Sequence, residues 1–300
     1  MGLLAGAQNW REHLGGAVFN LCAHAARLGH EIFLVSGVGA DARGQLALAR
    51  ARELGVGTRF VKTVAERETG IVTVTVDVNG EPSYVIHRPA AYDFAALDQA
   101  DFEELERWRP DWIAFGTLFS IEVNAKRLLS RILDRFPQAR RFYDVNLRKE
   151  SFTKELVTEL LAKADVVKLN ETEVGAVRRM LDWSEGPLEG FCRRCAEQLD
   201  CECVCVTRGE RGCAVLLADG YAEAAGLSIR VADAVGAGDA FAAGLLHAVA
   251  SGWGARQAAE FANRLGALVA SRSGAVPEWS REEVEGTTDR QHRPENGKRD

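Results

Sequence analysis

The sequence predicts an α/β fold in which a mainly parallel sheet is covered by helices and carries a small β lid. Strand-sized apolar runs alternate with segments of helical periodicity along most of the chain, which is typical of a parallel sheet. Glycines such as Gly29 and Gly55 end the helical segments. Only between Thr69 and His87 do apolar residues recur at every second position, as expected of a half-covered hairpin outside the main core.

Length and charge limit the classes of protein that this chain can represent. Its 300 residues, 47% of them hydrophobic, suffice for one large domain. A net charge of -6 argues against a nucleic-acid or anionic membrane partner, and no apolar run is long enough to span a membrane. We expect a cytoplasmic protein with one domain over residues 1–280, a lid inserted at about 57–90, and a disordered polar tail over 281–300.

The elements follow in order from these patterns. In the first third of the chain we expect a helix over 17–28, a strand over 31–38, a helix over 41–54, and a hairpin over 69–87 that turns at Asn79-Gly80. The alternation then resumes. We expect helices over 98–107, 122–136, 154–164, 171–181, 190–199, 239–251 and 255–271, strands over 112–115, 141–144, 166–169 and 204–207, and a hairpin over 213–224.

The cysteines could form either a metal site or part of the core. Six of the seven fall between Cys192 and Cys213, and Cys192 and Cys195 have the spacing of a zinc knuckle. No histidine lies nearby in the sequence, and a free cysteine is a common small buried hydrophobe. We therefore favour buried thiols over a structural zinc site, and an odd number of cysteines disfavours a disulfide framework.

The segment Val235-Gly236-Ala237-Gly238-Asp239 predicts an anion site at the start of a helix. Glycines let a phosphate approach the backbone, and the first N–H groups of a helix have no intrahelical acceptor. A carboxylate at this position would repel a phosphate. The presence of Asp239 is therefore explained best if its carboxylate faces a hydroxyl that attacks the phosphate. The segment is not a Walker A loop, and Gly37 to Ala42 lacks the third glycine of a dinucleotide fingerprint.

A second motif, near the start of the chain, indicates which class of protein the glycine turn belongs to. Gly15-Gly16-Ala17-Val18-Phe19-Asn20 lies more than two hundred residues upstream of the glycine turn. Together the two motifs resemble those of the ribokinase-type (PfkB-type) carbohydrate kinases, and the segments 14–20 and 86–93 are most similar to the fructokinase-like branch. The resemblance, which runs from about Leu14 to Pro277, implies a ribokinase-like three-layer α/β/α sandwich that transfers phosphate from ATP, with Mg²⁺, to a sugar hydroxyl.

The same resemblance implies a role for each matching residue. Asp239 would be the catalytic base, and the backbone of Gly236, Ala237 and Gly238 would hold the transferred phosphoryl group. Other positions fall into a sugar group, which is Gly15, Gly16, Asn20, Arg148 and His87, and a nucleotide group, which is Asn170, Glu173, Thr207, Gly209, Gly212 and Asn263. Glu173 would organise Mg²⁺ through water, Asp233 is a candidate ligand for a monovalent cation such as K⁺, and the lid would pair in a homodimer.

Each of these residues also has a structural interpretation. Asn170 and Glu173 could form a capping box at a helix start, and Asp239 could be an aspartate stabilised by the helix dipole. Arg148 could be a solvated surface charge beside Lys149, and His87 a histidine in a turn. The order of the two motifs along the chain favours the functional interpretation of Asp239.

The chain departs from the family pattern in two places. Ala234 stands where the family has a threonine, which removes one hydroxyl beside the turn. Only fourteen residues precede Gly15, and they hold no apolar strand that ends in the sugar-binding aspartate of the family. We therefore expect either a start codon placed too late or a truncated, weakened kinase, and we favour the first.

The substrate follows least directly from the sequence. A ketohexose such as fructose is the first expectation, from the fructokinase-like segments. The second is 2-keto-3-deoxygluconate, with Arg148 meeting its carboxylate, and the third is a nucleoside. A rival from another class is an N-terminally truncated, catalytically weak sugar-binding relative.

Overall fold

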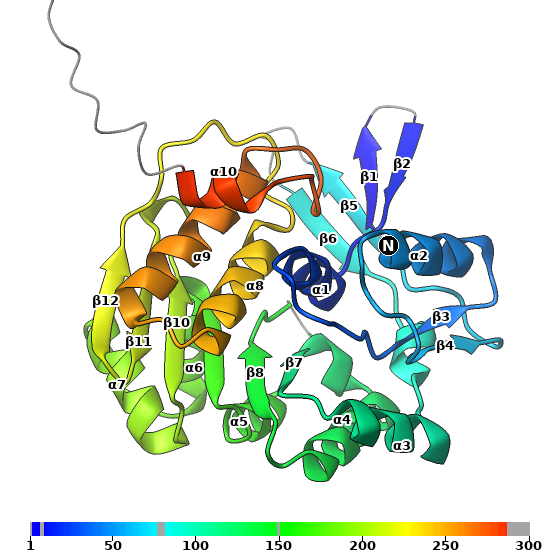
Figure 1. The fold of residues 1–300 in the computed structure, drawn as a ribbon, viewed down its shortest axis with the longest axis horizontal. Coiled ribbons are helices and arrows are strands. Elements are labelled where there is room, and N and C mark those ends of the chain that lie inside the picture. The colour runs from blue at the N-terminus through cyan, green and yellow to red at the C-terminus, as the bar shows by residue number, and fades with distance from the viewer. Residues whose placement is uncertain (1, 7–8, 77–81, 149–150, 287–300) are drawn as a thin grey trace, which may run out of the picture.

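A six-stranded sheet forms the centre of the molecule. The computed structural model describes residues 2–6, 9–76, 82–148 and 151–286. The sheet has the order β12-β11-β10-β9-β8-β7, and β7 to β10 are mutually parallel, whereas β11 runs antiparallel to both of its neighbours, β10 and β12 (Figure 1). Its strands are β7 (Trp112–Gly116), β8 (Arg140–Asp144), β9 (Val166–Asn170), β10 (Cys203–Thr207), β11 (Cys213–Leu217) and β12 (Gly220–Ala224). The predicted α/β fold with a mainly parallel sheet is confirmed.

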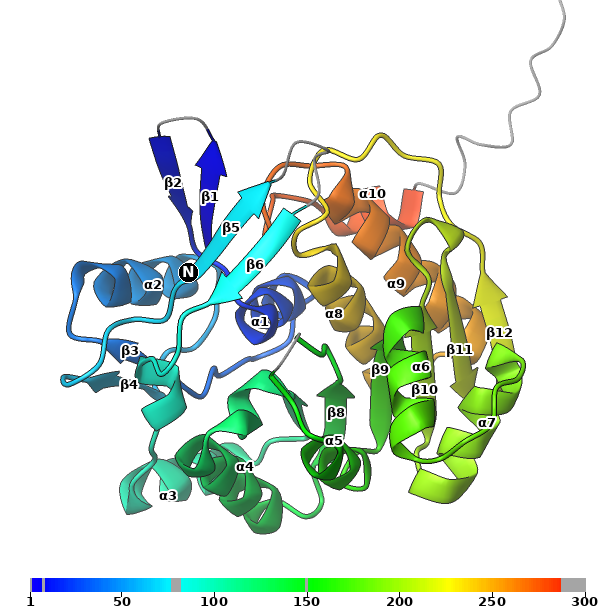
Figure 2. The same ribbon diagram turned by 180° about the vertical axis from the view of Figure 1, so that it is seen from behind.

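Helices cover both faces of this sheet, so the domain has three layers (Figures 1 and 2). One face packs against three helices, which are α1 (Ala17–Arg27), α8 (Ala237–Ala250) and α9 (Ala255–Ala270). The opposite face packs against α4 (Val123–Arg135), α5 (Lys154–Leu161), α6 (Glu171–Met180) and α7 (Leu188–Leu199). Helix α3 (Gln99–Trp108) packs beside α4 in a smaller apolar cluster with Phe60.

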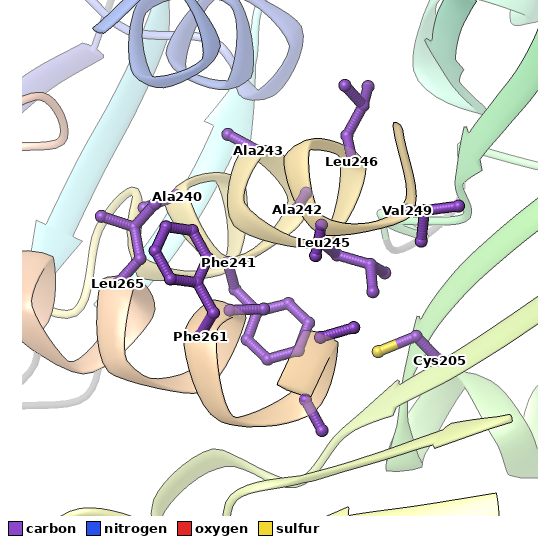
Figure 3. Close-up of a cluster of buried hydrophobic side chains, with 14 of the residues drawn as sticks. Cys205, Ala240, Phe241, Ala242, Ala243, Leu245, Leu246, Val249, Phe261 and Leu265 are labelled. Carbon is purple, nitrogen blue, oxygen red and sulfur yellow. The ribbon is translucent and has the colours of Figure 1, made fainter. Parts of the chain in front are cut away.

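The contact between α8 and α9 is close because small residues line it. A Cβ built on Gly244 would lie 3.1 Å from Cα of Ala262, so the two backbones nearly touch there. Phe241 and Phe261 fill the space toward Cys205 of the sheet (Figure 3). Truncating a buried phenylalanine costs about 3–5 kcal/mol of folding free energy. This packing therefore fixes α8 rigidly against the sheet, with its N-terminus at one end of the strands.

The cysteines belong to this core. All seven are free buried thiols, and Cys203, Cys205 and Cys213 line the cluster beneath α8 and α9, whereas Cys192 and Cys195 pack on the opposite face. Burial raises the pKa of the Cys213 thiol to about 12, so this thiol is neutral at physiological pH. The cysteine-rich stretch therefore acts as small apolar packing on both faces of the sheet.

The lid is a second, four-stranded sheet that includes the start of the chain. Its order is β2-β1-β5-β6, from β1 (Gly2–Gly6), β2 (Asn9–His13), β5 (Val72–Val76) and β6 (Pro82–Ile86). Strands β5 and β6 form the predicted hairpin, whose Asn79-Gly80 turn lies outside the described residues. The expectation that no apolar strand precedes Gly15 is wrong, because Gly2–Gly6 forms a strand that pairs in parallel with β5, about seventy residues further along the chain, although no aspartate ends it.

Several boundaries differ from expectation. The strand expected over 31–38 is displaced to β3 (Ser36–Gly39), which pairs with β4 (Val61–Val64), and α2 (Ala42–Glu53) follows it. The tail expected to be disordered from residue 281 begins instead with α10 (Arg281–Gly286), because Val284 is buried against α9. Short 3₁₀ turns occur at η1 (Ala91–Phe94), η2 (Leu118–Ile121) and η3 (Gly209–Arg211). Among the described residues, no helix is both long and apolar enough to cross a membrane.

Candidate functional site

The glycine turn at the start of α8 is held open by its backbone. Gly236 is the N-cap of α8 and has a φ of 83°, in the left-handed region that favours glycine. No side chain caps this helix. The N–H of Ala237 donates to the carbonyl of Ala234 at 3.4 Å, whereas the N–H groups of Gly238 and Asp239 belong to the open first turn. The turn therefore offers donors and the positive end of a helix dipole to an anion.

A neighbouring loop fixes the position of this turn. A Cβ on Gly236 would overlap the carbonyl oxygen of Ala275, so the two segments are in direct contact. That carbonyl accepts a hydrogen bond of 3.0 Å from Nε2 of His24 on α1, while Nδ1 of His24 accepts one from the Trp279 indole. Burial lowers the pKa of His24 to about 4, so the ring is neutral and donates only from Nε2. Helix α1 thus braces the turn through His24.

Asp239 and Asn20 bring the two sequence motifs into contact. Asn20 Nδ2 donates to Asp239 Oδ2 over 2.7 Å, although the residues lie 219 positions apart. Burial raises the pKa of Asp239 to about 6, an effect that the Asn20 hydrogen bond opposes and the charge of Asp144 reinforces. Oδ1 of Asn20 is buried and has no hydrogen-bond partner among the described residues. The pair therefore consists of a carboxylate with a raised pKa, from Asp239, and an amide oxygen of Asn20 that can still accept a hydrogen bond.

A buried lysine and a second carboxylate complete the charged cluster. Lys168 on β9 lies opposite Asp144 on β8, and its Nζ donates to both carboxylate oxygens at 3.0 and 3.1 Å. Burial alone would lower the pKa of Lys168, but Asp144 and Asp239 raise it above the ordinary value, so the ammonium is charged. Arg148 is exposed, and its charge lowers the pKa of Asp239. The predicted sugar residue Arg148 therefore lies within electrostatic reach of the base.

Glu173 connects two loops at the same edge of the sheet. Its Oε1 accepts the N–H of Leu147 at 2.7 Å, and its Oε2 accepts the N–H of Asn170 at 2.8 Å. Asn170 in turn caps α6 by accepting the N–H of Glu173 at 2.9 Å, so the capping box is present. Burial raises the pKa of Glu173, against the effect of the Asn170 N–H. Asn170 and Glu173 therefore do form a capping box. A second role of Glu173 would have to use the carboxylate lone pairs that accept no backbone N–H.

The other residues of the predicted nucleotide group have structural contacts. Thr207 at the end of β10 donates to the carbonyl of Leu169, and Asn263 on α9 donates to the carbonyl of Ala225 at 2.7 Å. Gly209 and Gly212 have φ values of 58° and 89° in the turn after β10. Thr207, Gly209 and Gly212 lie at or just after the carboxyl end of the parallel strand β10, which is where ligands of α/β sheets bind. Their role in holding a nucleotide stays a prediction.

The remaining predicted positions divide between the site and the lid. Gly16 begins α1 with a φ of 136°, without a side-chain cap, and leads into Asn20. Asp233 uses its two carboxylate oxygens to accept N–H groups of Val235 and Gly274, which ties the turn together. His87 forms its hydrogen bond, of 2.8 Å, to Thr73 across the lid hairpin. A cation role for Asp233 and a sugar role for His87 therefore stay predictions.

Sequence reasoning missed two members of the cluster as site residues, Lys168 and Asp144. The signal for Lys168 was present, since a charged residue interrupts the buried apolar run of β9. Asp144 was expected only as the last residue of the strand over 141–144. Only the register of β8 and β9 shows that the two side chains pair.

Comparisons with known proteins agree with this geometry. The model of the pfkB family of carbohydrate kinases matches residues 3–281. A fructokinase of Escherichia coli is 30% identical over 280 residues, which cover 87% of this chain and 87% of that protein. An ATP-dependent ribose-1-phosphate kinase of Halopiger xanaduensis is 28% identical over 278 residues, with coverage of 90% and 85%.

Solved structures show the same fold. A fructokinase of Vibrio cholerae, solved with fructose, ADP and calcium, superposes with a TM-score of 0.79 at 21% identity, over 95% of this chain and 94% of that chain. The family model covers nearly the whole chain, and both sequence motifs meet at Asp239. This protein therefore belongs to the PfkB family of carbohydrate kinases.

Proposed function

We propose that this carbohydrate kinase transfers the γ-phosphoryl group of ATP to a hydroxyl of a ketohexose, with Asp239 as the general base. The observation that supports this proposal most strongly is the contact between Asn20 and Asp239 at the open start of α8. It places a carboxylate of raised pKa beside backbone donors for an anion. A base and an anion site side by side are what in-line phosphoryl transfer to an alcohol requires.

The residues of the site would divide the work as follows. The orphaned Oδ1 of Asn20 would accept a hydrogen bond from one sugar hydroxyl, and Asp239 would accept the proton of the attacking hydroxyl. The N–H groups of Gly238 and Asp239 would donate to oxygens of the transferred group, on which negative charge must be held in the transition state. Because these donors are fixed by the packing of α8, they need little reorganisation when charge moves.

A divalent cation would be held indirectly. Within the described ranges, no three His, Cys, Asp or Glu side chains gather closely enough to hold a metal ion. Each carboxylate oxygen of Glu173 accepts one backbone N–H and keeps a further lone pair, which fits a contact to water on Mg²⁺ rather than to the ion itself. When bound with ATP, Mg²⁺ would neutralise charge on the phosphates.

The substrate class rests on the fructokinase-like segments and on the identity with the E. coli fructokinase. In the segment 86–93, the guanidinium of Arg88 pairs with Asp93 and also donates to the carbonyl of Leu118 at 3.0 Å, so it ties the lid to the loop after β7. An acidic sugar would favour the exposed Arg148 as its carboxylate partner, and this makes 2-keto-3-deoxygluconate the second candidate.

A coupled ADP-release assay tests the proposal across fructose, other ketohexoses, 2-keto-3-deoxygluconate, ribose and nucleosides. We expect fructose to give the largest kcat/KM. Asp239→Asn should lower kcat by about a hundredfold or more, with sugar affinity largely kept. Asp134→Asn, on the exposed side of α4, serves as the matched control and should leave turnover unchanged. Near-normal turnover of Asp239→Asn would refute the base, and a preference for the acidic sugar would refute the substrate.

A further inference from the structure

The segment that joins α9 to α10 is packed against the helices of the site. We call its residues 275–280 the C-terminal strap. Trp279 is only 6% exposed and belongs to the apolar cluster of α8 and α9, and Val276 packs against a second cluster that includes α1. The carbonyl of Pro277 accepts a hydrogen bond of 2.5 Å from Arg27 of α1. The strap is therefore held between α1 and the pair of helices that ends the fold.

One face of α1 contacts both the proposed base and the strap. Asn20 and His24 are four residues apart on this helix, so their side chains lie one above the other on the same face. Asn20 Nδ2 donates to Asp239, and His24 Nε2 donates to the carbonyl of Ala275 over 3.0 Å. Neighbouring side chains of a single helix thus fix the carboxylate of the site and the start of the strap relative to each other.

Both nitrogens of the His24 ring have a partner inside the protein. The residue is 0% exposed, so water does not compete for either nitrogen. Nδ1 accepts the indole N–H of Trp279 over 3.0 Å, and the two rings lie at an interplanar angle of 29°. Because an indole nitrogen can only donate, Nδ1 of the neutral imidazole is unprotonated and Nε2 carries the proton. Trp279 therefore decides that His24 faces Ala275 as a donor.

The carbonyl of Ala275 is also the group against which the glycine turn rests. A Cβ built on Gly236 would overlap the oxygen, Cα and Cβ of Ala275, so no space separates the two segments. In so close a contact, a displaced Ala275 carbonyl would have to displace Gly236 as well. The open N–H groups at the start of α8 follow Gly236 directly in the chain. Their position therefore depends on the hydrogen bond from His24.

We propose that His24 and Trp279 are positioning residues for phosphoryl transfer. The indole orients the imidazole, the imidazole holds the carbonyl of Ala275, and this carbonyl keeps the turn at Gly236 where its N–H groups meet the transferred phosphoryl group. The inference rests on the proposed function, since it adds positioning residues to the same reaction. Fixed donors stabilise the transition state without reorganisation, and a small displacement caused by a residue far from the reacting atoms can cost much of the rate.

Two amide substitutions at His24 separate its hydrogen bond to Ala275 from the bulk of the side chain. The amide nitrogen of glutamine reaches about as far as Nε2 of histidine, whereas that of asparagine reaches only about as far as Nδ1. We expect His24→Gln to keep kcat within about threefold of the wild type and His24→Asn to lower it about tenfold or more. The KM for the sugar should stay within about twofold in both variants, because Asn20 is unchanged. The control is Val157→Ala, which truncates a fully buried valine on the opposite face of the sheet and should lower the melting temperature without changing kcat.

The role of the indole is tested by Trp279→Phe, which keeps an aromatic ring but removes the N–H that donates to His24. We expect kcat to fall about tenfold, with the KM for the sugar within about twofold of the wild type. The backbone amide NMR signal of Gly238 should shift in the protein without ligands, because the turn moves. The control is Trp183→Phe, which removes an indole packed against Phe191 on the opposite face of the sheet and should change neither kcat nor this signal. Trp279→Phe also carries the test alone if His24→Asn does not fold.

Three results in an active enzyme would overturn the inference alone. The first is an equal kcat for His24→Asn and His24→Gln. The second is a Trp279→Phe variant whose kcat and Gly238 signal both match the wild type. The third is a loss of sugar affinity in place of kcat, because the turn would then not be the part that moves. A wild type that releases ADP with no sugar of the panel would instead overturn the proposed function, and the Gly238 signal would still report whether Trp279 holds the turn.

Discussion

Helices α6 and α8 begin on either side of Lys168, but their first turns are built in opposite ways. Asn170 and Glu173 close the start of α6 with a capping box, in which the N–H groups of both residues find acceptors within the chain. Helix α8 begins at Gly236 without any side-chain cap. Its carboxylate, Asp239, is turned instead toward Asn20 of α1. A helix start whose donors are already satisfied supports the framework, whereas one whose donors are left open can bind an anion.

The largest expected effect comes from closing the open turn. Gly236→Ala would place a Cβ onto the carbonyl oxygen of Ala275 in a left-handed conformation, which costs about 1–3 kcal/mol for the backbone alone. We expect a lower melting temperature and at least a hundredfold loss of kcat. Gly238→Ala is the matched variant, because its Cβ meets only an ordinary contact with Lys168. It should keep the wild-type melting temperature while kcat falls, since the methyl group lies at the open start of α8, where the anion would bind. Equal melting temperatures for the two variants would contradict this account.

The pH dependence tests the charge state of Asp239. Its pKa is raised to about 6, and a general base acts in its deprotonated form. The value of kcat/KM should therefore be level above pH 7 and fall about tenfold per pH unit below pH 6, as the carboxylate takes up a proton. A profile measured with the preferred sugar at constant ionic strength checks this. An acid limb centred near pH 4 would show that burial does not control this carboxylate.

Asn20 makes the next contribution, through the same carboxylate. Its hydrogen bond lowers the pKa of Asp239, so Asn20→Ala should shift the acid limb of kcat/KM to higher pH. The loss of the Oδ1 acceptor should also raise KM for the sugar about tenfold. Asn124→Ala, which removes an exposed amide of α4, is the control and should not move the limb. An unchanged acid limb in Asn20→Ala would exclude the coupling.

The capped helix allows a subtler test of Glu173. Asn170→Ala removes the cap alone and should cost about 1 kcal/mol of folding free energy. Glu173→Gln weakens the same box but also removes the charge that would organise water on Mg²⁺. Both variants should therefore lose similar stability, and only Glu173→Gln should need more Mg²⁺ for half-maximal turnover, by about tenfold. A shared Mg²⁺ requirement would leave Glu173 with a capping role only.

The smallest effect on turnover is expected at the lid. Val85 on β6 is 52% exposed, which suits the predicted pairing of lids in a homodimer. Val85→Lys should lower the sedimentation coefficient to that of a monomer and change kcat less than threefold. Thr73→Lys is no suitable control, because Thr73 binds His87. The control is Leu46→Lys, which changes an exposed leucine of α2 outside the lid. A wild type that sediments as a monomer would refute the lid dimer.

Much of the fold was determined by local sequence. The spacing of apolar residues predicted α1, α2, α4 and the parallel strands β7 to β10 within a few residues, because periodicity records which face of an element is buried. The two glycine motifs predicted the helix starts that meet in the site, since left-handed backbone at Gly236 depends on a residue without a Cβ. The capping box of α6 was equally local.

Tertiary structure alone decided which charges meet. Asn20 and Asp239 come from helices 219 residues apart, and Lys168 finds Asp144 only through the register of β8 and β9. The same holds for His24, which positions Ala275 against Gly236, and for β1, which joins the lid sheet beside β5. Local periodicity shows that a face is buried but not what it is buried against. The pKa of a carboxylate depends on which groups surround it in the folded protein, because burial and neighbouring charges both act through space.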